Sequence, residues 1–423
     1  MKLFKNTDEL VKFWYDRGSS RERSVHDAVR TILSDVRRDG DSALLKYTRN
    51  YDGVELDSLK IDNAAIKSAR DSLSTELERI FLQAAENIRE FHRKQLPGSW
   101  TGVSREGVKL GQWYSPVESA GIYIPGGKAV YPSTVLMNVI PAQVAGVPRI
   151  AVVSPPCENG TAAGLVLACA DLLGIDEIYA VGGAQAVGAL AFGTESVKPV
   201  VKITGPGNKY VNEAKLQVFG KVGIDMPAGP TELVIYADKH APIEYIIWDI
   251  FAQAEHDQDA KVALVTTAPD LPPRLEKALS AFLTEAERKD IIQASLHENG
   301  CILGVESVDQ AVEAINRIAP EHLELLAVNA VEISQEIKNA GAIFLGNHTP
   351  NVVGDYWAGP NHTLPTSGAA KFASPLGVLD FMKFSSLTAY SQEGMRRAAA
   401  DIAAFARAEK LYAHARSAEV RNE

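Results

Sequence analysis

The chain has 423 residues, of which 46% are hydrophobic and 23% are charged, a balance typical of globular proteins. Its 43 basic and 53 acidic residues give a net charge of -10 with no strongly basic run, so a nucleic-acid-binding surface is not expected. A chain of this length can form two or three domains.

The cysteines and the first residues indicate the compartment. Cys157, Cys169 and Cys301 are too scattered for a disulfide framework or a CxxC metal site, which favours a reducing environment. The first ten residues, MKLFKNTDEL, lack the apolar core of a signal peptide, and no run of about 18 apolar residues predicts a membrane span. We therefore expect a cytoplasmic protein without membrane contact.

Residues 1 to about 95 show the periodicity of helices. Before Gly40, apolar residues recur at helical spacing, namely Val25, Val29, Ile32, Leu33 and Val36. A second helical stretch, from 73, ends at Pro97–Gly98. His26 and His92 stand among charged neighbours in these stretches, so we interpret both as surface residues.

From about residue 120, short apolar runs alternate with Ala-rich helical stretches. AGIYIPGG, RIAVVSPP, EIYAVGG and PVVKITGPGN are each typical of a strand that ends at Pro or Gly. A second series, from TELVIYAD to GAIFLG, predicts another unit of the same kind. The fold class is therefore α/β, with parallel-type sheets covered by helices on both faces. The segment 350–385 is rich in turns, and the last 33 residues predict one long helix with a polar tail, of a kind that often packs on another subunit.

Two glycine turns follow predicted strands of the first series. They are Gly182–Gly183–Ala184–Gln185 and Gly205–Pro206–Gly207–Asn208, and neither forms a Walker A loop or a GxGxxG motif. At a strand end, their backbone N–H groups can meet a phosphate. A dinucleotide site of unusual design and a pair of plain tight turns both remain open.

Potential metal ligands gather in the second half of the sequence. In FAQAEHDQDA, Gln253 and His256 are three residues apart, so a helix would present both on one face. Further candidates follow in the turn-rich segment, beside Pro320 and near the end, namely Asp355, His362, Glu321, His322, Glu409 and His414. Taken singly, each is more simply a surface or capping residue, and Pro320 suits the first turn of a helix. Together, such nitrogen and oxygen ligands suit zinc in a Lewis-acid role, although spacing does not show that they converge.

Several longer motifs resemble histidinol dehydrogenase, in the same order from about residue 25 to the end. They are GIYIPGGKAVYPSTVLMNVIPAQVAGV, VGGAQAVGALAFGTESV, GPGNKYV, DMPAGPTE, AQAEHD, PEHLE, GDYWAGPNHTLPT and AEKLYAHARSAEVR. The resemblance implies a homodimer that oxidises L-histidinol to L-histidine in two NAD-dependent steps through histidinal. It further implies one zinc ion per subunit and active sites shared between the two chains.

The resemblance assigns roles to individual positions. The implied zinc ligands are Gln253, His256, Asp355 and, from the partner subunit, His414. The implied catalytic bases are His322, for both oxidations, and Glu321, which would activate water for the second. The substrate would contact these four ligands, His322, and three further positions, Thr231, His362 and Glu409. The implied NAD contacts are Tyr123, Gln185 and Asn208.

The expected architecture comprises two Rossmann-like α/β domains and helical segments at both ends. A helical segment of residues 1–18 would precede a first domain of residues 19–120 and 232–373, which would carry most metal ligands. Residues 121–231 would form the NAD-binding domain, and residues 388–423 a helical tail that packs on the partner subunit.

One position departs from the family pattern and leaves alternatives. Thr231 stands where these enzymes usually have Ser in AGPSE, and related dehydrogenases of sulfonated diols can carry Thr there. The segments DYWAGPNH and PEHLE are more similar to the histidinol enzymes, which keeps histidinol first. A zinc hydrolase with Glu321 as its base, or a metal-binding scaffold without catalysis, would also accommodate the candidate ligands.

Overall fold

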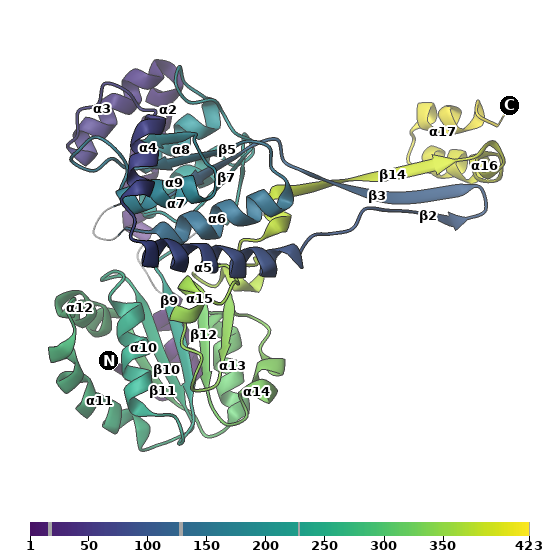
Figure 1. Ribbon diagram of the computed structural model, residues 1–423. Helices are drawn as coiled ribbons and strands as arrows, with labels where there is room; N and C mark the ends of the chain where they lie inside the picture. The colour runs from purple at the N-terminus through teal and green to yellow at the C-terminus, as the bar shows by residue number, and fades with distance from the viewer. Residues whose placement is uncertain (16–18, 127–129, 227–228, 423) are drawn as a thin grey trace.

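The computed structural model describes residues 1–15, 19–126, 130–226 and 229–422. Two α/β lobes form the body of the molecule, and a long arm leaves the body and ends in a pair of helices (Figure 1). Among the described residues, no helix is long and apolar enough to cross a membrane.

The first lobe is built on a five-stranded parallel sheet in the order β6-β5-β4-β7-β8. Its strands are β4 (Ala120–Tyr123), β5 (Ile150–Ser154), β6 (Ile178–Ala180), β7 (Lys202–Thr204) and β8 (Gly223–Ile224). The helices α6 (Pro132–Ala145), α7 (Gly164–Leu172), α8 (Gly183–Phe192) and α9 (Lys209–Val218) alternate with these strands. Since helices cover both faces, the central strands are buried on both sides and read as continuous apolar runs.

The N-terminal helices join this same lobe. They are α2 (Ser19–Asp39), α3 (Asp41–Asp52), α4 (Asn63–Asp71) and α5 (Thr75–Arg93). Helix α2 packs on α8 and α9, α4 packs on α7, and α5 packs on α6. This packing differs from the sequence-based division, which grouped residues 19–120 with residues 232–373. Periodicity shows that a helix has an apolar face but does not show which sheet that face covers.

The second lobe is built on a six-stranded parallel sheet in the order β1-β11-β10-β9-β12-β13. Its strands are β1 (Lys2–Phe4), β9 (Glu232–Ala237), β10 (Lys261–Thr266), β11 (Gly300–Gly304), β12 (His322–Leu326) and β13 (Ala342–Leu345). Its helices are α1 (Thr7–Tyr15), α10 (Ile243–Ala254), α11 (Leu271–Phe282), α12 (Lys289–Asn299), α13 (Val308–Ile318), α14 (Ala330–Glu336) and α15 (Val352–Tyr356). Short 3₁₀ turns lie at η1 (Leu283–Glu285), η2 (Ala369–Lys371) and η3 (Val378–Phe381). The chain therefore begins with a strand, where the sequence indicated a helical segment.

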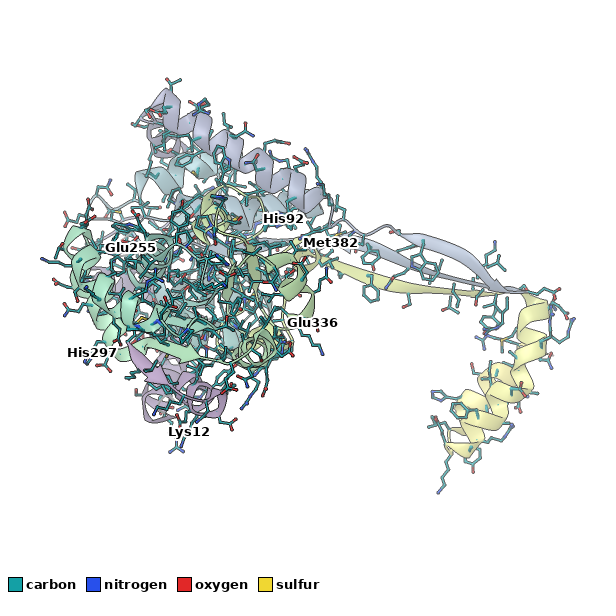
Figure 2. All side chains as sticks on the ribbon, turned by 90° about the horizontal axis from the view of Figure 1, so that it is seen from below. Lys12, His92, Glu255, His297, Glu336 and Met382 are labelled. Atoms are coloured by element: carbon teal, nitrogen blue, oxygen red, sulfur yellow. The ribbon has the colours of Figure 1, made fainter. Side chains whose placement is uncertain are left out.

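The arm is an antiparallel three-stranded sheet that the sequence did not reveal. Strand β3 (Val108–Pro116) lies between β2 (Trp100–Arg105) and β14 (Met382–Tyr390), and α16 (Gln392–Ala408) and α17 (Tyr412–Glu419) pack together at its tip. Figure 2 shows the side chains of the arm standing clear of the body. Most of β14 and all of β2 are exposed, so the described residues leave most of this sheet uncovered.

Two further sequence predictions are wrong. His92 is fully buried, with its Nδ1 atom 2.8 Å from the carbonyl oxygen of Ile88, so it is a core residue of α5. The predicted single C-terminal helix is interrupted around Lys410, which has a positive φ of 61°, and two helices result. A non-glycine residue in the left-handed region ends an α-helix because helical geometry cannot continue through it.

Candidate active site

A large cleft lies where the two lobes meet. It has a volume of about 1330 Å³, and its walls include Asn208 and Lys209 of the first lobe and Gly229, Pro230 and Asp257 of the second. Asn208 follows the carboxyl end of β7, while Gly229 and Pro230 precede the amino end of β9. The cleft therefore joins the carboxyl edge of one sheet to the amino edge of the other.

Glu321 and His322 lie at the amino edge of the second sheet. The prediction that they begin a helix is wrong, because His322 is the first residue of β12 and Glu321 directly precedes it. Both are buried, with exposed fractions of 7% and 5%. The His322 ring stacks on Phe344 of β13, and Gly354 leaves room for Phe344, since a Cβ there would press on its ring.

Backbone and side-chain groups of β9 hold this pair. The Glu321 Oε2 atom accepts hydrogen bonds from Thr231 Oγ1 at 2.7 Å and from the Glu232 backbone N–H at 2.8 Å. The His322 Nδ1 atom lies 3.0 Å from the Glu232 carbonyl oxygen and 3.5 Å from Glu321 Oε2. Because a carbonyl only accepts, Nδ1 carries the proton, and Nε2 remains as the ring nitrogen that can accept one.

Thr231 also links the Glu321–His322 pair to Gln253. The Gln253 Nε2 group donates a hydrogen bond to Thr231 Oγ1, which in turn donates to Glu321. On the other side, Asn351 Nδ2 donates to Gln253 Oε1 at 2.8 Å, so both ends of the amide are oriented. The Asn351 backbone N–H donates to Glu324 Oε1 at 2.6 Å. The departure from Ser at position 231 therefore retains the hydroxyl in a continuous chain of hydrogen bonds.

The other ligand candidates lie at the end of α10 and in α15. His256 follows the last turn of α10 and is exposed, and Asp355 is half-buried in α15. The His362 Nδ1 atom lies 3.2 Å from the Asp355 carbonyl oxygen and 3.9 Å from its Oδ1. Since Asn351 immediately precedes α15 and bonds to Gln253, the ends of α10 and α15 are adjacent.

His414 and Glu409 are not part of this arrangement within one chain. Glu409 follows the last residue of α16, and His414 lies in α17, both at the far end of the arm (Figure 1). Both residues are exposed.

Burial and neighbouring charges shift the pKa values of two histidines at the site in opposite directions. Burial alone would lower the pKa of His322, but the carboxylates of Glu321 and Asp355 outweigh burial and raise that pKa to about 9. Burial lowers the pKa of His362, against the opposing charge of Asp355. An imidazole accepts a proton only in its neutral form, so His322 would act as a base only if a bound cation offset the neighbouring carboxylates.

The implied NAD contacts surround the point where the first sheet changes direction. From β4 the chain proceeds through β5 and β6 on one side and through β7 and β8 on the other, and ligands of open α/β sheets bind at such points. Tyr123 ends β4, and its buried hydroxyl accepts the Gly183 N–H at 3.1 Å. Gln185 is 1% exposed, and its Oε1 atom has no hydrogen-bond partner among the described groups, so an acceptor is available for a ligand.

The second glycine turn meets β4 at the same point. A Cβ on Gly205 would lie against the Tyr123 carbonyl oxygen, and Gly205 has a positive φ of 119°, so glycine is required there. Buried Lys215 and Asp225 form an ion pair beneath this turn, and Lys215 Nζ donates to the Gly205 carbonyl at 3.1 Å. Asn208 caps α9 by accepting from the backbone N–H groups of Tyr210 and Val211.

The donor set is compatible with the implied zinc ion but is incomplete in one chain. Within the part of the chain that the structure describes, no three His, Cys, Asp or Glu side chains gather to hold a metal. The arrangement at α10 and α15 offers an imidazole, a carboxylate and the amide oxygen of Gln253, a nitrogen and oxygen set that zinc accepts. A fourth ligand has to come from elsewhere, and His414 on the arm is the implied one.

Sequence reasoning missed several residues that shape this site. These residues belong to no recognisable catalytic motif: Glu232 acts through its main chain, Phe344 through ring packing, and Asn351 through its side-chain amide. Position provided one usable signal, since Glu232 is a charged residue at the start of an otherwise apolar strand.

A buried Glu–His pair at the amino edge of one parallel sheet and glycine turns at the switch point of the other are features of an α/β enzyme of the dehydrogenase type. The family model described as histidinol dehydrogenase matches residues 15–422. Histidinol dehydrogenase from Bacillus subtilis (strain 168) is 48% identical over 406 residues, covering 96% of this chain and 94% of that protein. The protein of that name from Bacillus licheniformis is 48% identical over 417 residues, covering 99% and 97%.

A solved structure agrees with these sequence matches. The crystal structure of histidinol dehydrogenase from Elizabethkingia anophelis superposes with a TM-score of 0.94 at 35% identity, covering 100% of this chain and 98% of that chain. The chain belongs to the histidinol dehydrogenase family. The expected α/β fold and the recognition of the family from its motifs are therefore confirmed, and the protein is an oxidoreductase.

Proposed function

We propose that the protein oxidises L-histidinol to L-histidine in two NAD-dependent steps, with histidinal held between them. The observation that carries this proposal is the buried Glu321–His322 pair, which Thr231 connects to Gln253. Such a pair offers two proton acceptors beside one candidate ligand group. The family membership supports the substrate.

In the first oxidation, His322 Nε2 would take the hydroxyl proton of histidinol, which prepares the carbinol carbon to lose hydride. The Nδ1 atom is engaged by the Glu232 carbonyl, so the imidazole is held with Nε2 free. A positioned base makes such a proton transfer fast when its pKa lies near the working pH, and for His322 a cation at the ligand group would lower the pKa from about 9 toward that range. The NAD molecule supplies the hydride acceptor.

In the second oxidation, water adds to the aldehyde, and the resulting diol loses hydride to a second NAD. The Glu321 carboxylate takes the proton of that water, and His322 again takes a hydroxyl proton. Overall, one histidinol, one water and two NAD yield one histidine and two NADH with release of three protons. Thr231 and the Glu232 N–H both bond to Glu321 Oε2, which leaves Oε1 for the water.

The metal and the cofactor would bind on opposite sides of the cleft. Gln253, His256 and Asp355, with the partner subunit's His414, would hold one zinc per subunit, and the ion would orient the substrate as a template. Thr231, His362 and the partner subunit's Glu409 would contact the substrate. Tyr123, Gln185 and Asn208 would hold NAD, and the free acceptor on Gln185 supports this side of the proposal.

The arm supports the proposal of a homodimer with shared sites. Its exposed apolar side chains would be costly to leave in water, and they include Trp113, Phe384, Phe405 and Tyr412. A two-fold partner would cover both arms and bring each tip to the other chain's cleft.

An absorbance assay at 340 nm tests the reaction. Purified protein with zinc, NAD and L-histidinol should form two NADH per histidinol, and chromatography should identify histidine. The same assay with sulfonated diols tests the substrate alternative that Thr231 raises.

The zinc ion is tested separately. Chelation should abolish turnover, and His256→Ala should reduce bound zinc measured by mass spectrometry. Full turnover in metal-free protein, or turnover of the diols alone, would contradict the proposal.

A further inference from the structure

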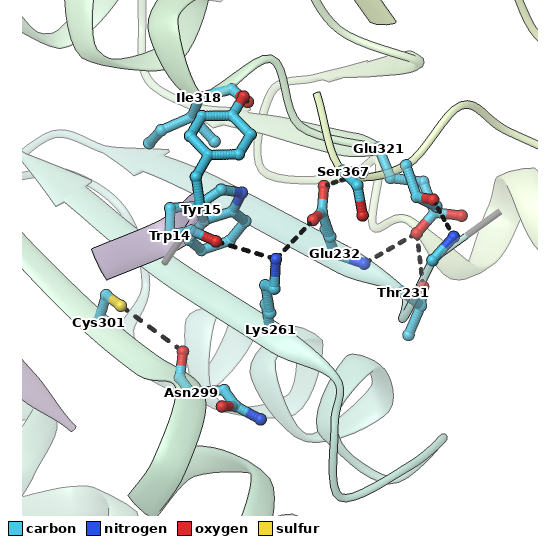
Figure 3. Close-up of polar contacts among 12 residues, drawn as sticks. Trp14, Tyr15, Thr231, Glu232, Lys261, Asn299, Cys301, Ile318, Glu321 and Ser367 are labelled. Carbon is cyan, nitrogen blue, oxygen red and sulfur yellow. Dashed lines mark hydrogen bonds and ion pairs between the residues drawn. The ribbon is translucent and has the colours of Figure 1, made fainter. Parts of the chain in front are cut away.

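The Glu232 side chain is buried beneath the catalytic pair and has no role in the reaction as described above. Its exposed fraction is 0%, and it forms an ion pair with Lys261, which is 6% exposed (Figure 3). The Lys261 Nζ atom lies 3.2 Å from Glu232 Oε1 and donates to the Trp14 carbonyl at 3.0 Å. The Ser367 N–H donates to the other Glu232 oxygen, Oε2, at 3.2 Å.

Two segments distant in the sequence therefore meet at the Glu232 carboxylate, and a third is tied to it through Lys261. Trp14 lies in the last turn of α1, Lys261 is the first residue of β10, and Ser367 lies in the loop before η2. The Lys261 ammonium also lies 5.3 Å from the centre of the Trp14 ring. These contacts fix the position at which β9 begins.

The backbone of the same residue orients both catalytic groups. The Glu232 N–H donates to Glu321, and the Glu232 carbonyl accepts from His322. Register adds to this constraint, because His322 pairs with Leu233, the residue after Glu232. A displacement of residue 232 would therefore move Glu321 and His322 together.

Stability alone is a weak reason for such a pair. Removing two charges from water costs several kcal/mol per ion, and apolar replacements of buried pairs are often neutral or stabilising. A buried pair that specifies a unique geometry is the better-supported role for such groups.

We infer that Glu232 is a positioning residue, whose side chain is clamped by Lys261 and Ser367 so that its backbone holds Glu321 and His322 in their working geometry. This inference rests on the proposed function. Two consequences separate it from a structural role. Binding of zinc should not depend on the ion pair, and the catalytic constant should not follow stability.

The decisive comparison uses the full-length, zinc-loaded protein and three variants. Glu232→Gln keeps the shape and removes the charge, and it leaves Lys261 buried without a carboxylate, so its melting temperature should fall. Lys261→Met combined with Glu232→Gln removes both charges and should restore the melting temperature to within a few degrees of wild type. Glu177→Gln is the control, since Glu177 pairs with Arg149 in the first lobe at 2.7 Å and contacts no site residue.

The positioning role predicts that kcat stays low in the charge-free double variant. A misplacement of the order of 1 Å can cost about 100-fold, so kcat should fall roughly 10- to 100-fold in both Glu232 variants. The KM for histidinol and the bound zinc should stay within about threefold of wild type, and the control should keep its kcat. If the double variant regains both melting temperature and kcat, Glu232 is only structural and the inference is wrong. If wild type itself forms no NADH from histidinol, the proposed function fails instead.

Discussion

The position of His414 leads to a prediction about mixed dimers. Strand β14 has nine residues, which at about 3.3 Å per residue carry the arm roughly 30 Å from the body. A zinc ligand has to approach the ion to about 2 Å. His414 at the tip of the arm therefore cannot complete the site of its own chain, and a complete site should combine His256 of one chain with His414 of another.

His256→Ala and His414→Ala should each be inactive as homodimers, because every site lacks one ligand. In a mixed dimer both lesions fall in one site, and the other site keeps an intact His256 and an intact His414. Random mixing at equal amounts makes about half of all dimers mixed, so roughly a quarter of all sites should recover.

The assay is NADH formation after co-expression of the two variants with different affinity tags and purification through both tags. The doubly tagged fraction should show about half of the wild-type activity per dimer and should bind about half as much zinc. A mixture of separately purified homodimers that are kept from exchanging is the control, and it should remain inactive. Background activity in proven mixed dimers would refute the shared site and require all ligands to come from one chain.

Other predictions address the bases, the residue that departs from the family pattern and a buried carboxyl pair. His322→Asn should slow oxidation of both histidinol and histidinal by about 10² to 10⁴, as is usual for a general base. Glu321→Gln should mainly slow histidinal oxidation, and equal losses on both substrates in single-turnover assays would contradict the division of roles. Thr231→Val leaves buried Gln253 Nε2 without its acceptor and removes one of the two hydrogen bonds that Glu321 Oε2 accepts, at about 1–3 kcal/mol, so kcat/KM should fall roughly 5- to 100-fold. Thr231→Ser keeps the hydroxyl and should remain near wild type; a similar loss in both variants would implicate the methyl group instead. Burial and the hydrogen-bonded carboxyl of Asp249 raise the pKa of Glu324 well above its usual range. Because that folded-state pKa lies above the unfolded value, the stabilising contribution is present at low pH and is lost as pH rises through the folded pKa. Glu324→Gln stays neutral, so its melting temperature should vary less than that of wild type between about pH 5 and pH 9. Parallel curves in calorimetry would show that the carboxyl pair does not titrate there.

The sequence by itself determined the alternation of strands and helices. Strands such as β5 and β10 are buried on both faces, so they stand out as continuous apolar runs bounded by Pro, Gly or polar residues. The motifs also sufficed to identify the family, because they are long and keep their order along the chain. These signals are local, so they can be recognised without knowing which strands or helices each segment packs against.

Prediction from the sequence failed where the environment or secondary structure of a residue depends on its neighbours in space. His92 has charged neighbours along the chain but lies on the buried face of α5, so neighbours in sequence misrepresented its environment. Strand β12 begins two residues after Pro320, which also suits a helix start, and only pairing with β9 and β13 makes it a strand. Strands β2, β3 and β14 carry no continuous apolar run, because the arm has no core within the chain.

Only the tertiary structure decided how the site is assembled. Thr231 and Glu321 are 90 residues apart in the chain, yet their side chains bond at 2.7 Å because β9 and β12 are neighbours in one sheet. The same pairing brings the Glu232 backbone to His322. Sequence motifs name the reactive groups, but the hydrogen bonds that orient them come from strand order and register, which are set by packing across the whole lobe.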